Sequence, residues 1–194
     1  MTGIETLVYE HENILRMLAV VRKACLGILE GQEIDYDDFK SVIGFIRGYA
    51  DSHHHGKEEK LLFNRMLEEL GGLAEKLVKH GMLVEHDLGR LFVRELEEAL
   101  DKSRNGDQEA KLDVIANAIG YANLLKRHIE KEDKVVYPFS IRELKAGTVK
   151  EFDADSEVYE RKAEQIRIQE HYLDVLKRLE EKYLVQHGDA HVRG

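Results

Sequence analysis

The sequence predicts an all-α fold, an up-down-up-down antiparallel four-helix bundle with an additional C-terminal helix. The 194 residues contain one proline, no tryptophan, and 35% charged beside 43% hydrophobic residues. This composition favours helices, because proline is excluded from helix interiors and long charged side chains are tolerated there. Apolar residues also recur at steps of three and four, and glycine-containing turns divide this pattern into long segments. A chain of this length suits one domain with a substantial core.

A glycine and an aspartate delimit the first two helices. Apolar residues over 4–29 form one stripe of a helix, and Gly31 follows the last of them, as glycine often does at helix ends. Asp35 or Asp37 can cap a second helix by accepting hydrogen bonds from its first amides. The apolar pattern of this helix continues to about residue 70, where a Gly-Gly pair stops it.

Three further helices follow along the chain. The third is expected over 73–103, before an Asn-Gly turn, and the fourth over 107–136, ending before Pro138. A fifth amphipathic segment is expected over 156–183, and the final "HGDAHVRG" is expected to fray. Residues 1–140 should therefore form the bundle, and residues 141–194 a linker plus an accessory helix of the same globular unit. The accessory helix can cover an end of the bundle or form a homodimer with a second subunit.

Charge and cysteine content narrow the classes of partner. The formal net charge is -9, whereas a surface for nucleic acid or anionic membrane needs clustered Lys and Arg. The single Cys25 excludes an intrachain disulfide framework. We find no basic-then-apolar leader and no apolar run near the roughly 20 residues of a membrane span. These observations predict a cytoplasmic protein with a small ligand, no nucleic acid and no membrane as partner.

Two stretches of the chain are nearly the same. They are "HHGKEEKLLF" at 54–63 and "HIEKEDKVVY" at 128–137, about 74 positions apart. Each contains a His and a Glu four positions apart, namely His54 with Glu58 and His128 with Glu132. Helical geometry places residues i and i+4 on one face, so each stretch can present an imidazole and a carboxylate together.

Four histidines fall at one height of the predicted bundle. Antiparallel neighbours share a turn, so height can be counted from that turn at about 1.5 Å per residue. This count places His11, His54, His86 and His128 within about one helical turn of one another. With the two glutamates they form a set of six inward donors: His11, His54, Glu58, His86, His128 and Glu132.

Six nitrogen and oxygen donors suit two metal ions, because two carboxylates can bridge the ions and offset their mutual repulsion. Iron or manganese fits this donor set, and zinc is an alternative. A lone histidine is more often a core or surface residue than a ligand, and the two glutamates could pair with lysines on a helix surface. Those alternatives leave the duplicated spacing and the shared height unexplained. In the run 53–55, consecutive side chains point about 100° apart, so we assign His54 and leave His53 and His55 as neighbours.

The motifs His11, His54-x-x-x-Glu58, His86 and His128-x-x-x-Glu132 resemble the hemerythrin-like (HHE cation-binding) family over roughly residues 4–140. The resemblance implies a four-helix bundle with a non-haem di-iron centre and an oxo or hydroxo bridge. It implies that the histidines are terminal ligands, and that Glu58 and Glu132 bridge the ions.

The chain departs from the oxygen-carrying members at one or two positions. Their third helix carries His-x-x-x-His, whereas Met82 stands four residues before His86, so a fifth histidine is missing. Their second bridging carboxylate is an Asp five residues after the last His, which would correspond to Asp133. We choose Glu132 because it matches Glu58 in the repeat.

Three functional classes remain open at this stage. We favour a protein that binds or senses O2, NO or related oxidants, because the missing histidine leaves an exchangeable position on a redox metal. The alternatives are a di-iron enzyme for peroxide or nitric oxide detoxification or iron-centre repair, and iron storage or handling. Whether the protein is an enzyme stays open, since no general acid or base is identifiable apart from the ligands.

Overall fold

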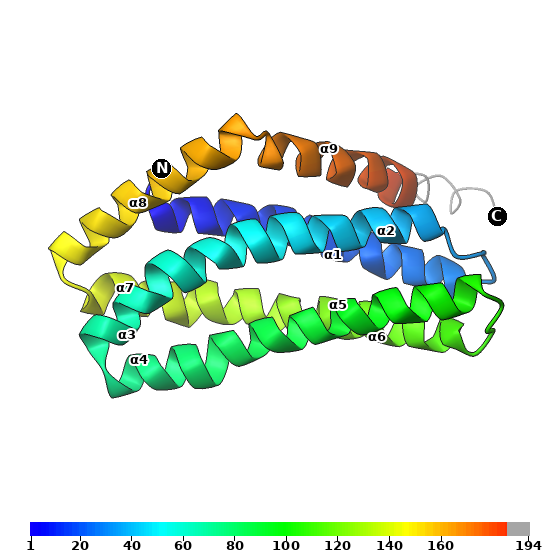
Figure 1. Ribbon diagram of the computed structural model, residues 1–194, viewed down its shortest axis with the longest axis horizontal. Coiled ribbons are helices and arrows are strands. Elements are labelled where there is room, and N and C mark those ends of the chain that lie inside the picture. Colours follow the sequence, from blue (N-terminus) through cyan, green and yellow to red (C-terminus); the bar gives the residue numbers. More distant parts are fainter. Residues whose placement is uncertain (186–194) are drawn as a thin grey trace, which may run out of the picture.

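The computed structural model describes residues 1–185, and every regular element within them is a helix (Figure 1). The first long helix is α1 (Gly3–Leu29). The second runs without interruption over 36–70 and alternates α-helix with wider π-helical segments. Its parts are α2 (Tyr36–Phe45), η1 (Ile46–His55), η2 (Glu58–Phe63) and α3 (Asn64–Leu70). The predicted fraying at 187–194 lies outside the described residues.

The third and fourth long helices complete an antiparallel bundle (Figure 1). The third consists of α4 (Gly72–Leu77), η3 (Val78–Met82) and α5 (Leu83–Arg104), and the fourth of α6 (Ala110–Lys131), η4 (Glu132–Val136) and α7 (Tyr137–Glu143). The helix α1 contacts α6 and η1, while α5 contacts α6 and α2. The second and fourth long helices therefore stand diagonally across the bundle, and the predicted fold class is confirmed.

Local chemistry explains where these helices begin and turn. Thr2 and Glu5 form a capping box at the start of α1, and Asp35 accepts a hydrogen bond from the amide of Asp38 at the start of α2. Gly31, Gly71 and Gly106 have φ angles of 95°, 62° and 98° in the three turns. Positive φ favours glycine, which is why glycines separate the helices.

The fourth helix does not end before Pro138, so that prediction is wrong. It continues through α7 to Glu143. The π-helical segment η4 precedes the proline, and the amide of Tyr137 donates to the carbonyl of Glu132, five residues back. Proline cannot donate and crowds the carbonyl four residues back, and this wider turn relieves both problems locally.

The additional C-terminal helix is confirmed, but it begins before residue 156 and is divided in two. The structure has two helices here, α8 (Ala146–Gln165) and α9 (Ile168–Glu180), followed by η5 (Glu181–Val185). Arg167 separates them with a φ of 54°. The bend lets α8 pack against α1 and η2, while α9 packs against α1, α2 and η1 (Figure 1). Leu176 and Leu179 of α9 are buried within the same chain. A homodimer through this region stays a prediction.

The core consists of two apolar clusters with a polar layer between them. One cluster includes Ile14, Phe45 and Leu96, and also contains Leu176 and Leu179 of α9. The other is built from the opposite end of the long helices and from Phe152 of α8, and it includes Leu7, Phe63, Met66, Val78 and Tyr137. Each long helix passes from one cluster to the other through a buried His or Glu. The polar layer is therefore enclosed by apolar side chains at both ends.

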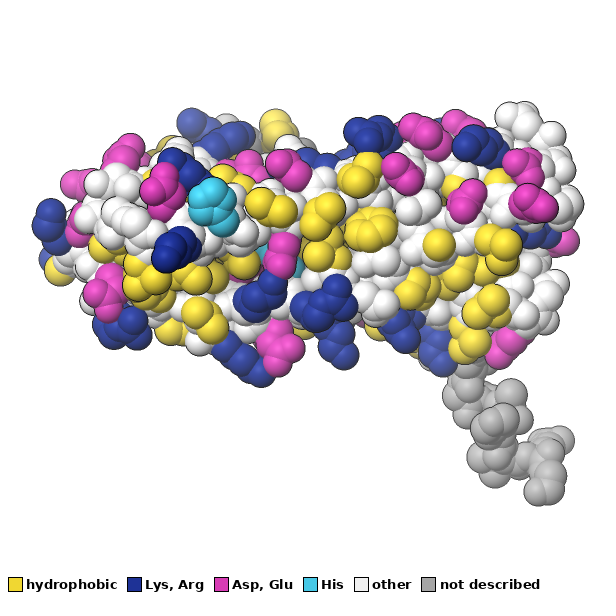
Figure 2. Space-filling view, turned by 90° about the horizontal axis from the view of Figure 1, so that it is seen from below, with side chains coloured by type: hydrophobic (Ala, Val, Ile, Leu, Met, Phe, Trp, Pro, Cys, Tyr) yellow, Lys and Arg dark blue, Asp and Glu magenta, His cyan; other side chains and the backbone are white. Residues whose placement is uncertain are grey.

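The outer surface is mixed in character. Figure 2 shows the face that is turned downward in Figure 1, where hydrophobic side chains lie between basic and acidic ones. No helix in the described part of the chain is long and apolar enough to cross a membrane.

Candidate metal centre

The polar layer brings all six predicted donors together. They form two overlapping groups in which the potential ligand atoms lie within 4.8 Å of one another. We call them group 1, which is His11, His54, Glu58 and Glu132, and group 2, which is His55, Glu58, His86 and His128. All seven side chains are buried, with residue exposures of 4% or less. Glu58 belongs to both groups, and His55 joins the six residues that the sequence predicted.

The two carboxylates lie between the groups. Glu132 Oε2 is 3.3 Å from His11 Nε2, and Glu132 Oε1 is 3.1 Å from His128 Nε2. Glu58 Oε2 is 3.7 Å from His54 Nε2 and 3.5 Å from His86 Nε2. Adjacent donors about 2.1 Å from one six-coordinate ion lie roughly 3 Å apart. Both carboxylates are therefore placed where they can contact ions in both groups.

Several of these donor atoms have no other use in the fold. Among the described residues, five buried atoms of the two groups make no hydrogen bond: His54 Nε2, His55 Nε2, Glu58 Oε2 and both carboxylate oxygens of Glu132. A buried polar atom without a partner costs about 1–3 kcal/mol, so such a cluster needs compensation. A bound cation would satisfy these atoms together, and the residues fit a metal site.

Each imidazole is held from outside by a carboxylate. The Nδ1 atom contacts a carboxylate oxygen at 2.8–3.3 Å in five pairs: His11 with Asp133, His54 with Glu10, His55 with Asp51, His86 with Glu59 and His128 with Glu85. Such a contact fixes the tautomer and turns Nε2 into the layer, where His86 Nε2 and His128 Nε2 lie 3.0 Å apart. Asp133, the alternative to Glu132 as the second bridging carboxylate, thus lies on the outer side of His11.

Sequence reasoning missed the roles of these five carboxylates. Glu10 and Glu85 each precede a candidate histidine, and Glu59 and Asp133 each follow a candidate glutamate. Of the five carboxylates, only Glu59 and Asp133 stand in the repeated stretches, and, apart from Asp51 and His55, which share η1, each carboxylate and its histidine lie on different helices. Only the packing of the helices identifies those partners.

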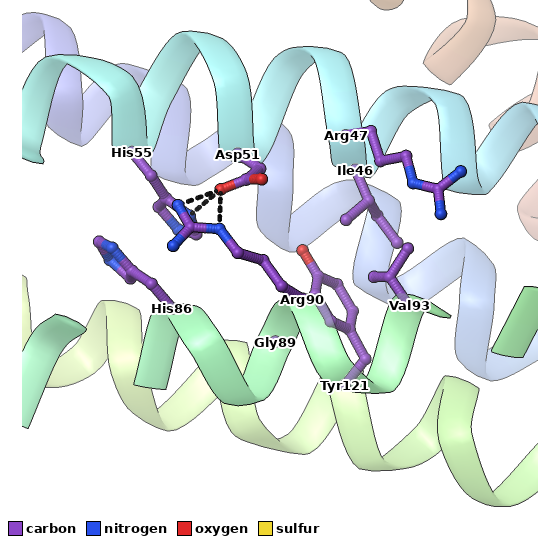
Figure 3. Close-up of a pocket in the computed structure, with 9 residues that line it drawn as sticks. All are labelled: Ile46, Arg47, Asp51, His55, His86, Gly89, Arg90, Val93 and Tyr121. Atoms are coloured by element: carbon purple, nitrogen blue, oxygen red, sulfur yellow. Dashed lines mark hydrogen bonds and ion pairs between the residues drawn. The ribbon is translucent and has the colours of Figure 1, made fainter. Parts of the chain in front are cut away.

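Arg90 joins two of the outer carboxylates. Its guanidinium donates to Asp51 Oδ1 and to Glu59 Oε1, both at 2.7 Å. Figure 3 shows this side chain reaching from α5 toward Asp51 and His55 on η1. A small pocket of about 70 Å³ lies beside it, lined by residues that include His55, His86 and Tyr121. Arg90 therefore holds the supports of two histidines of group 2 at the edge of this pocket.

A second buried polar cluster adjoins group 1. The fully buried Lys57 donates to Glu10 and to Glu160 of α8, and His53 contacts Glu10 at 2.9 Å. Glu10, His53 and Glu160 are spaced as metal ligands could be. The Lys57 ammonium already supplies the positive charge there, although the buried His53 Nδ1 makes no hydrogen bond among the described residues. The effect of the cluster is to link α8 to the carboxylate that orients His54.

The charges within the layer depend on one another. Burial and the nearby Glu132 carboxylate raise the pKa of Glu58 well above its usual value. Burial would also raise the pKa of Glu132, but His128 and His11 hold it well below its usual range. Tyr137 donates a hydrogen bond of 2.6 Å to Glu58 Oε1. Without metal, the layer therefore keeps one carboxylate ionised beside protonated imidazoles.

The chain is similar in sequence to known proteins. Residues 2–140 match the family of the hemerythrin HHE cation-binding domain. Uncharacterized proteins of Mycobacterium bovis and of two strains of Mycobacterium tuberculosis are each 23% identical to the chain over 137 residues. The aligned part is 71% of this chain and 52% of theirs. The chain thus spans about half the length of the curated relatives it matches.

Proposed function

The chain belongs to the hemerythrin HHE cation-binding domain family, and from this we propose that it is a non-haem di-iron protein that binds or senses O2, NO or related oxidants. The observation that carries the proposal is the layer of unpaired inward donor atoms, arranged as two groups that share Glu58. One ion would use only part of this set, and two ions bridged by carboxylates would use all of it.

Each group would hold one ion. His11 and His54 would bind the first, His55, His86 and His128 the second, and Glu58 and Glu132 would bridge them. A bound iron pair supplies one-electron redox chemistry and an exchangeable position for a small ligand. The chain's own residues orient the imidazoles through their Nδ1 atoms, place the bridging carboxylates and exclude bulk water. Manganese and zinc fit the same donors and are the alternative metals.

The test is an optical spectrum of the anaerobically reduced, iron-loaded protein before and after addition of O2 and of NO. We expect a new visible band with each ligand and its loss when the ligand is removed. Irreversible oxidation in air, with no spectrum of a ligand complex, would contradict reversible binding. The metal-free protein is the control.

Two further measurements on the iron-loaded protein separate the alternative functions. Consumption of peroxide or NO faster than by free iron would identify an enzyme of detoxification. Release of the metal on reduction would identify iron storage or handling. A small diatomic or peroxide ligand, a cytoplasmic location and a homodimer remain parts of the proposal.

A further inference from the structure

The metal layer is built from two halves that repeat along the chain. Residues of the first two long helices correspond to residues of the last two, about 74 or 75 positions later. The matched residues are Glu10-His11 with Glu85-His86, His54 with His128, and Glu58-Glu59 with Glu132-Asp133. The outer contacts repeat as well, because Glu10 holds His54 as Glu85 holds His128, and Glu59 holds His86 as Asp133 holds His11. The layer therefore has an approximate twofold symmetry.

His55 is the first break in this symmetry. The matching position in the second half is Ile129, which lies in an apolar cluster. The ring of His55 stacks on His86 with centroids 3.8 Å apart, and both line the pocket in Figure 3. This imidazole is therefore an additional donor in group 2 that has no counterpart in group 1.

Tyr137 is the second break. It matches Phe63, and the two rings take equivalent places, since Tyr137 stacks on His11 at 5.5 Å and Phe63 on His86 at 6.0 Å. Only Tyr137 adds a hydroxyl, which donates to Glu58 Oε1 and lies 3.3 Å from His11 Nε2. The hydroxyl thus lies at the edge of group 1, on the side that lacks the additional histidine.

Together the two breaks make the metal positions unequal. Group 2 offers three histidines with the two carboxylates, whereas group 1 offers two histidines with the same carboxylates. An ion that takes about six donors is therefore more open at group 1. Building on the proposed di-iron function, we infer that Tyr137 turns its single hydroxyl proton from Glu58 Oε1 to the small ligand that binds at the open position of group 1.

This role selects a class of ligand. Because the hydroxyl proton already has an acceptor in Glu58 Oε1, it can turn only to a ligand whose outer atom accepts a hydrogen bond in its place. NO, O2 and peroxide meet this requirement, and a ligand without an accepting atom does not. Tyr137 would thus determine specificity without binding the metal.

The test compares NO complexes of the iron-loaded wild type and Tyr137→Phe. Tyr49→Phe is the matched control, because Tyr49 is fully buried in an apolar cluster and its hydroxyl accepts a hydrogen bond from Asn13. We expect Tyr137→Phe to keep the iron content and to release NO about five- to tenfold faster, as the loss of one hydrogen bond implies. The infrared N–O stretching frequency should shift, and its sensitivity to D2O should disappear, only in Tyr137→Phe.

Three results would overturn the inference while leaving the di-iron proposal intact. Unchanged NO release and N–O frequency in Tyr137→Phe would mean that the hydroxyl only positions Glu58. Loss of iron from Tyr137→Phe would mean that the hydroxyl is needed to build the centre. A visible absorption band present in the wild type and absent in Tyr137→Phe before NO is added would make the phenolate itself a ligand. Absence of iron from the wild type would instead refute the proposed function, and this inference with it.

Discussion

One side chain, His55, makes the two metal groups different, because it belongs to group 2 and has no counterpart in group 1. It directly follows His54 in η1, Asp51 contacts its Nδ1 atom, and its buried Nε2 atom makes no hydrogen bond among the described residues. Burial lowers the pKa of His55 well below its usual value, so the imidazole is neutral at physiological pH. A neutral imidazole with a free, inward nitrogen is the form that binds metal.

Replacing His55 should therefore affect one ion more than the other. We expect His55→Ala to keep the fold and to lose about half of the bound iron, measured by elemental analysis of the purified protein. His80→Ala is the control, since His80 is an exposed histidine of η3. Full iron content in His55→Ala would show that His55 is not a ligand.

The stability of the metal-free protein should depend on pH through two other histidines. Burial opposes protonation of His11 and His128, but their contacts with carboxylates outweigh it and raise the pKa of His11 to about 9 and of His128 to about 10. Because these values exceed that of an unfolded histidine, about 6.5, the folded state binds the protons more tightly. The resulting stabilisation is complete below about pH 6.5 and is lost as the pH rises toward 9 and 10.

We therefore expect the thermal midpoint of the metal-free protein to fall as the pH is raised from 6.5 to 9. The iron-loaded protein should not show this fall, because metal-bound imidazoles are already deprotonated. A midpoint of the metal-free protein that stays constant or rises over this range would contradict the ion pairs described for His11 and His128.

The six donors could be predicted from sequence spacing, because in regular helices the number of residues from a shared turn gives the height of a side chain along the bundle axis. His55 was missed because the angle of 100° between successive residues holds for an α-helix, whereas residues 46–55 form a π-helical segment. The wider turn lets His54 and His55 both reach the layer. His53 lies beside Glu10 and Lys57 instead.

At the scale of elements, π-helical segments accompany the metal groups. His54 and His55 lie at the end of η1, Glu58 begins η2 and Glu132 begins η4. Such segments are frequent at functional sites, because they redirect side chains without breaking a helix. The repeat of His-x-x-x-Glu thus has a matching repeat in backbone geometry.

The packing of α9 on η1 depends on a glycine. A Cβ atom at Gly48 would overlap the side chain of Tyr172, whereas one at Gly44 would meet no atom within 4 Å. We expect Gly48→Ala to lower the free energy of unfolding by about 1–3 kcal/mol, as forced overpacking does. Gly44→Ala, its control, should raise it by about 0.5–1 kcal/mol through helix propensity. Denaturant unfolding measures both, and equal effects would contradict the close contact with α9.

Helix boundaries could be predicted where a glycine or a capping residue marks them. The break at Arg167 carries no such mark, since it lies between Ile166 and Ile168. A left-handed conformation costs a non-glycine residue about 1–2 kcal/mol. Here the packing of α8 and α9 on separate parts of the bundle offsets that cost, and no local pattern reveals such a balance.

The whole molecule encloses its polar layer between two apolar clusters, and the C-terminal helices contribute to both. Phe152 of α8 belongs to one cluster, and Leu176 and Leu179 of α9 belong to the other. Glu160 of α8 also reaches Lys57 beside the metal groups. These contacts agree with the division into residues 1–140 and 141–194 as parts of the same globular unit, which stays a prediction.

The central claim is that this layer holds two iron ions. Elemental analysis of protein produced with iron and purified in folded form tests it most directly. We expect about two iron ions per chain in the wild type, and a large loss of iron in Glu58→Gln, which removes a shared carboxylate. Folded wild-type protein without metal, or Glu58→Gln with its full metal content, would show that the layer does not hold an iron pair through Glu58.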